Sequence, residues 1–98
     1  MTRVERVKAH EAQMRDVQDA VDALHMAIAA FVRQQPTAEL LRRYYESALW
    51  KSDFAADEAG RLPPELPRGV LSEDGLYNLL EEYDALLRML QTAGEADA

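Results

Sequence analysis

The sequence predicts an all-α fold, a three- to four-helix bundle with a long N-terminal helix, a kinked second helix, a Pro-rich connector and a C-terminal helix. Apolar residues recur every three or four positions over most of the chain, which is typical of amphipathic helices. No alternating strand pattern is present, and three of the four prolines fall together between residues 61 and 71. Because 98 residues suffice for one domain and not two, we expect a single helical domain over residues 1–98.

The first helix is expected over about residues 3–34, a stretch without Gly or Pro. Its apolar stripe follows the three-and-four spacing of a heptad repeat and consists of Val7, Met14, Val17, Val21, Leu24, Ile28 and Phe31. His10 occupies a core position of that repeat, which would suit a weak or pH-sensitive contact with another chain. A helix of this length spans about 45 Å, more than a compact domain of this mass needs.

The second helical segment is expected in two pieces, at about 38–46 and 48–59. Pro36 disfavours a helical residue before it, and Thr37 is a suitable N-cap for the first piece. Ser47 offers a second cap, so a kink or short break is expected near Glu46. Gly60 stands where a left-handed C-cap ends the second piece.

An ordered connector is expected over 60–71, because its prolines exclude a helix interior and its apolar residues can pack. Ser72 then caps a last helix over about 73–91, with two acidic residues in its first turn. The apolar stripe of this helix comprises Leu76, Leu79, Leu80, Tyr83, Leu86, Leu87 and Leu90. Residues 92–98 are expected to form a frayed tail.

One dense pattern runs from the second helix into the last one. It reads YY at 44–45, S at 47, W at 50, DF at 53–54, ADEAG at 56–60, LP at 62–63 and RGVLSEDGLYNLL from residue 68. This pattern resembles the bacterial family called domain of unknown function 4298. Glu46 departs from it, since the family would have a Gly or another helix breaker there. The resemblance implies a small helical bacterial domain, and it implies no activity.

Composition limits the classes of function. The absence of Cys excludes disulfide frameworks, thiolate zinc sites and thiol nucleophiles, and it fits a reducing compartment. Residues 1–51 carry eight Lys and Arg against seven Asp and Glu, whereas residues 52–98 carry three against eleven. That acidic second half disfavours nucleic-acid binding. No apolar run could span a membrane and no apolar segment follows the basic start, so we expect a cytoplasmic protein. We expect no cofactor.

The candidate site is a cluster with a structural or an interaction role, and no residue of it is assigned to catalysis. Trp50 and Phe54, four residues apart on one helix, are expected to pack in the core. Asp53 and Asp57 are expected to pair with Arg68, or with Arg61, and so to hold the connector. The full cluster is Tyr44, Tyr45, Trp50, Asp53, Phe54, Asp57, Glu58, Arg68 and Ser72.

A competing interpretation makes the acidic residues a metal site. Asp53, Asp57 and Glu58 could join Glu81 and Glu82 of the last helix, as in all-α nucleotide pyrophosphohydrolases that hold Mg²⁺ through carboxylates. The full paired acidic motifs of those enzymes are missing here, and no basic cluster for a triphosphate is nearby.

The expected function is therefore a non-catalytic protein-interaction or regulatory module with an unidentified protein partner. Self-association through the first helix remains open, because its stripe exceeds what the chain itself needs. Two alternatives stay open beside it: a metal-dependent phosphate or nucleotide hydrolase that uses the acidic residues of the third and fourth helices, and an acidic partner of a basic protein.

Overall fold

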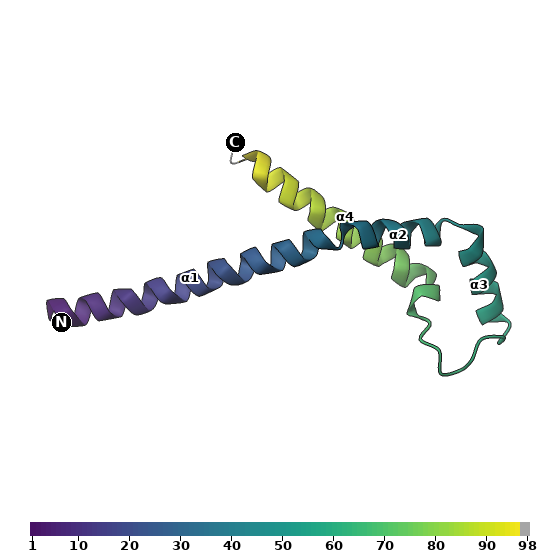
Figure 1. The fold of residues 1–98 in the computed structure, drawn as a ribbon, viewed down its shortest axis with the longest axis horizontal. Coiled ribbons are helices and arrows are strands. Elements are labelled where there is room, and N and C mark those ends of the chain that lie inside the picture. Colours follow the sequence, from purple (N-terminus) through teal and green to yellow (C-terminus); the bar gives the residue numbers. More distant parts are fainter. Residues whose placement is uncertain (97–98) are drawn as a thin grey trace. The chain divides into compact units, whose positions relative to one another are not determined.

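The computed structural model describes residues 1–96, and every regular element within them is helical, which confirms the all-α class. The elements are α1 (Arg3–Arg33), α2 (Gln35–Tyr45), α3 (Ala48–Glu58), the 3₁₀ turn η1 (Gly69–Leu71) and α4 (Glu73–Ala96). Figure 1 labels the α-helices along the ribbon. The chain divides into two compact units, Met1–Gln34 and Gln35–Ala98, which are described separately below. That residues 1–98 form one domain stays a prediction.

Helix α1 forms the first unit almost entirely. Thr2 caps its start, because the Thr2 hydroxyl accepts a hydrogen bond of 3.1 Å from the backbone N–H of Glu5. The helix ends at Arg33, beside the expected end at residue 34, and no residue of α1 is buried.

Helix α2 opens the second unit at Gln35, earlier than the expected start at about residue 38. Pro36 therefore lies inside the first turn, and Thr37 is not the N-cap. The expectation was wrong because a proline in the first turn sacrifices no intrahelical hydrogen bond, so its missing N–H does not end the helix there. α2 ends at Tyr45.

The break between α2 and α3 falls at Glu46 and Ser47. Ser47 leaves the helical region with φ −91° and ψ 161°, and its hydroxyl accepts a hydrogen bond from the backbone N–H of Trp50. The capping serine ends α2 and starts α3 even though Glu46 is a good helix former. Sequence therefore located the break correctly.

Gly60 ends α3 in a left-handed conformation, with φ +69°. The N–H of Arg61 bonds to the carbonyl of Ala56, and the N–H of Gly60 bonds to that of Asp57. These are the two bonds of a Schellman motif, and they satisfy carbonyls that the end of the helix would otherwise leave unpaired.

The connector leads through η1 to α4, which starts at Glu73 and continues to Ala96. α4 thus passes the expected end near residue 91, and most of the expected frayed tail is helical. The last two residues of that tail, 97–98, lie outside the described residues. Nothing in the polar sequence after Gln91 forbids helix, since Pro is absent and small residues are tolerated there.

The hydrophobic core of the second unit consists of four buried residues, Trp50, Leu71, Leu76 and Leu80, with exposed fractions of 3 to 7%. They bring together α3, η1 and α4, and Leu41, Tyr44, Tyr45, Phe54 and Leu62 pack around them. Leu79 and Leu86 were expected in the α4 stripe and are exposed instead, so the packed stripe is narrower than the leucine pattern. No helix within residues 1–96 has the length and apolar character needed to cross a membrane.

Candidate functional site

Four aromatic residues meet where α2, α3 and the connector come together. The Tyr45 ring lies edge-on to the Trp50 indole, with centroids 5.1 Å apart, and Phe54 stacks on Trp50 at 5.2 Å. Tyr44 packs against the same core. The break at Ser47 lets α3 turn away from α2, and Trp50 then lies between Tyr45 of α2 and Phe54 of α3.

Trp50 also holds the connector by a polar contact. Its indole N–H donates a hydrogen bond of 2.9 Å to the backbone carbonyl of Val70, within η1. A buried indole generally needs such a partner, because an unpaired N–H loses its hydrogen bonds to water. The amino-acid sequence carries no signal for this bond, because the acceptor belongs to the backbone.

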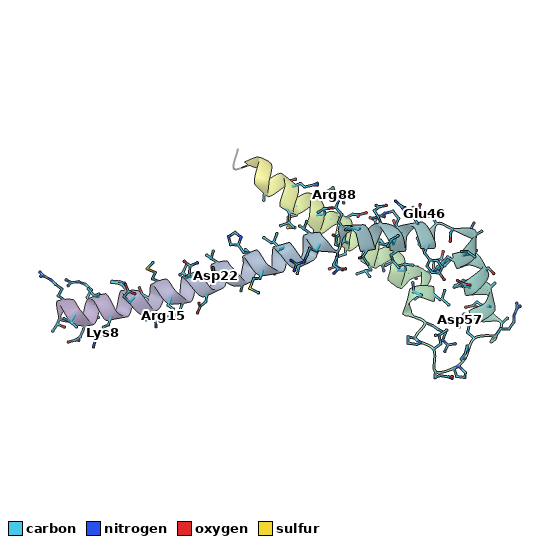
Figure 2. The ribbon with its side chains drawn as sticks, in the orientation of Figure 1. Lys8, Arg15, Asp22, Glu46, Asp57 and Arg88 are labelled. Atoms are coloured by element: carbon cyan, nitrogen blue, oxygen red, sulfur yellow. The ribbon has the colours of Figure 1, made fainter. Side chains whose placement is uncertain are left out.

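An ion pair fastens the connector to α3 a short distance away. Arg68 Nη1 lies 2.8 Å from Asp57 Oδ1, and the two side chains are 38% and 23% exposed. Asp57, labelled in Figure 2, lies near the end of α3 beside the connector. Of the two carboxylates expected to receive an Arg, Asp57 does so, and the Arg is Arg68.

Asp53 has a different partner from the one expected. The Tyr44 hydroxyl donates a hydrogen bond of 2.5 Å to Asp53 Oδ2 and so joins α2 to α3 across the break. This hydrogen bond, together with burial and the charge of Asp53, raises the pKa of Tyr44 to about 12. Sequence reasoning treated Tyr44 only as an aromatic residue and missed this contact.

A second ion pair, between Arg42 of α2 and Asp84 of α4, was also missed. Arg42 Nη2 lies 2.7 and 2.9 Å from the two carboxylate oxygens of Asp84, and Glu39 lies 3.4 Å from Arg42 Nε. Burial acts to lower the pKa of Arg42, but the two carboxylates outweigh it and raise the pKa above its usual value. The partners are forty-two positions apart in the sequence, so no local pattern could have revealed the pair.

Ser72 acts as the cap of α4, as its position suggested. Its hydroxyl accepts a hydrogen bond of 3.2 Å from the backbone N–H of Gly75. A Cβ at Gly75 would lie 2.9 Å from that hydroxyl oxygen, so glycine leaves room for the cap. Glu58, another member of the predicted cluster, is exposed at the end of α3.

The acidic residues of the metal-site interpretation have separate environments. Asp53 and Asp57 are engaged by Tyr44 and Arg68, whereas Glu81 and Glu82 are exposed on α4. Among residues 1–96, no group of three or more His, Asp or Glu side chains is placed to hold a metal ion. This geometry can anchor the connector to α3 and join α2 to α3.

A second feature that could act on other molecules is the apolar stripe of α1. Val7, Met14, Val17, Val21 and Leu24 are all exposed, and Val17 and Leu24 each show more than 60% of their surface. Val21, Leu24, His25 and Ile28 line a shallow hollow of about 110 Å³. Figure 2 labels Lys8, Arg15 and Asp22 along α1. They stand seven residues apart, and each directly follows one apolar residue of the stripe.

Comparison with known proteins gives one result. The family model described as Domain of unknown function (DUF4298) matches residues 7–92. The match covers both the α1 stripe and the aromatic cluster with its connector. A search of curated proteins and a search of solved structures each found no match.

Proposed function

This chain belongs to the family described as Domain of unknown function (DUF4298), and we propose that it is a non-catalytic protein-interaction module of the cytoplasm. In this proposal, α1 binds a helix of another protein chain through its apolar stripe, and such contact regulates or assembles the partner. The unit formed by residues 35–98 has a hydrophobic core of its own. The exposed stripe of α1 is the observation that carries the proposal.

The length of α1 supports a contact role. Its 31 residues span about 46 Å, and an isolated helix in water gains little stability from backbone propensity alone. Most helices are stabilised by packing an amphipathic face, yet no residue of α1 is buried. A contiguous row of exposed apolar side chains with this spacing is typical of surfaces that bind another helix.

The contacts of the aromatic cluster support a structural role for its polar and charged residues. Trp50, Tyr44 and Arg68 each use their polar groups to tie one element of the second unit to another. The carboxylates of Asp53 and Asp57 accept two of these hydrogen bonds. These contacts therefore favour a scaffold over the metal-dependent hydrolase.

A photo-cross-linking experiment tests the proposal. A photoreactive amino acid placed at Val17 of the full chain, in the cells that produce it, is expected to give a covalent adduct with a protein. The matched control carries the same amino acid at Asp19, which lies on the opposite side of α1, and gives much less adduct. Equal yields from the two positions, or none from either, would contradict the proposal. The mass of the adduct tells a second copy of 11.1 kDa from another protein.

A further inference from the structure

We infer that the partner of α1 is a second copy of this chain, paired with it in parallel and in register; the inference rests on the proposed function and specifies its partner. The seven-residue repeat, written abcdefg with Val7 at a, places Met14, Val21 and Ile28 at a as well. His10, Val17, Leu24 and Phe31 then occupy d. Such a repeat is sustained over residues 7–31, long enough for a two-stranded coiled coil.

The choice of side chains in this stripe favours two parallel helices. Three of the four a positions, Val7, Val21 and Ile28, are β-branched, and Leu24 occupies d. In parallel dimers, β-branched residues at a combined with Leu at d favour two strands. A branched side chain at a has few rotamers to lose when it packs against its equivalent in the second copy.

The hollow on α1 has the form that receives a side chain of such a partner. In a coiled coil each a or d side chain inserts between four residues of the facing helix. Val21, Leu24, His25 and Ile28 stand at spacings of three, four and seven residues from the first, which is the spacing of one such hole. In a parallel pair this hole, centred on the d residue Leu24, receives Leu24 of the second copy.

Charges at the flanks of the stripe set the orientation. Between residues 4 and 32, the e and g positions contain only two residues among Asp, Glu, Lys and Arg: Arg6 at g and Glu11 at e. In a parallel pair, a g residue lies beside the next e residue of the partner, so Arg6 meets Glu11 of the second copy on both sides. In an antiparallel pair that overlaps the whole stripe, Arg6 lies beside Gln34 and Glu11 beside His25, and neither neighbour is an Asp, Glu, Lys or Arg.

The remaining charges of α1 do not oppose this orientation strongly. Asp16, Asp19 and Asp22 cluster in the middle of α1, and side-by-side copies bring these groups into the same region. They occupy the outward b, c and f positions, where water and salt screen charges beyond about 8–10 Å. The two Arg6–Glu11 contacts lie at the interface itself and therefore decide the orientation.

Single-thiol cross-linking of the full chain tests the pairing, since the chain has no Cys of its own. Analytical ultracentrifugation of the full chain is expected first to show the mass of a dimer. With Val7→Cys and a short bis-maleimide, a parallel pair then gives a self-cross-linked dimer, because the two thiols face each other. In the antiparallel pair that overlaps the whole stripe, Val7 lies opposite Phe31, about 36 Å along the axis from its equivalent. That arrangement leaves the Val7→Cys chain uncross-linked and instead cross-links a mixture of the Met14→Cys and Leu24→Cys chains, whose thiols then lie opposite each other.

Ala12→Cys is the matched control, because position f points away from the partner, and it is expected to remain uncross-linked. A charge-swap pair gives a second readout that leaves the stripe intact. Arg6→Glu is expected to weaken self-association about fivefold to tenfold, and the double variant Arg6→Glu/Glu11→Arg to restore it.

Each remaining outcome has a distinct meaning. A dimer that cross-links only in the mixed sample overturns the parallel pairing and leaves a self-associating α1. A monomer at every concentration overturns the second copy as partner. In that case, an adduct with another protein at Val17 would still support the proposed function, and the absence of any adduct would overturn that function too.

Discussion

Replacing Trp50 by Phe is expected to loosen the connector and destabilise the unit formed by residues 35–98. The substitution removes the 2.9 Å hydrogen bond to the Val70 carbonyl, which contributes about 0.5–1.5 kcal/mol. Trp50 is only 7% exposed, so the ring atoms that Phe lacks leave a gap among well-packed neighbours. That loss adds about 1–2 kcal/mol. We therefore expect the free energy of unfolding to fall by about 2–3 kcal/mol, and Tm by about 10–20 °C.

Urea unfolding followed by the near-ultraviolet circular dichroism of tyrosine measures this effect. All four tyrosines lie in residues 35–98, so the signal reports on this unit and not on α1. Tyr77→Phe is the control, because Tyr77 is 52% exposed and its change should stay within about 0.5 kcal/mol. A Trp50→Phe variant that is no less stable than this control would refute the role given to the indole.

Three further predictions concern the same unit. Because the pKa of Tyr44 is raised to about 12, its contribution to stability is fully present below pH about 10 and is lost as pH rises through about 12. Unfolding measured across this range should show the loss in the native chain and a smaller one in Tyr44→Phe. Gly60→Ala should cost about 1 kcal/mol, because φ is +69° there, whereas Gly69→Ala, which has open space for a Cβ, should cost less; similar thermal melts for the two would contradict this reasoning. A double-mutant cycle of Asp57→Asn and Arg68→Ala should give a coupling energy of about 0.5–1 kcal/mol, and if neither variant changes thermal stability, the ion pair does not hold the connector.

Local signals explain the features of this fold that sequence predicted well. Ser47, Gly60 and Ser72 act within one turn of their own position, so their capping roles can be recognised from neighbouring residues alone. The all-α class follows from the spacing of apolar residues, which needs no knowledge of tertiary contacts. Pro36 misled the prediction, because a proline's effect depends on which turn of the helix it occupies.

Contacts between distant elements explain what sequence could not predict. From sequence alone, several carboxylates were possible partners for each Arg. The packing of η1 against α3 is what brings Arg68 to Asp57. Asp84 was not among the predicted partners, since nothing local links α4 to Arg42. Likewise, the leucine pattern of α4 predicts a broad stripe, but the core covers Leu76 and Leu80 and leaves Leu79 exposed.

A photo-cross-linking scan along α1, one position at a time from residue 12 to 24, shows directly whether the apolar stripe contacts another protein chain. If the apolar stripe is the contact surface, adduct yield should rise and fall with the three-and-four spacing of the stripe. It should be highest at Met14, Val17, Val21 and Leu24, and lowest at Ala12 and Asp19. Uniform yields, or adducts that peak on the outward face of α1, would contradict a contact through the apolar stripe.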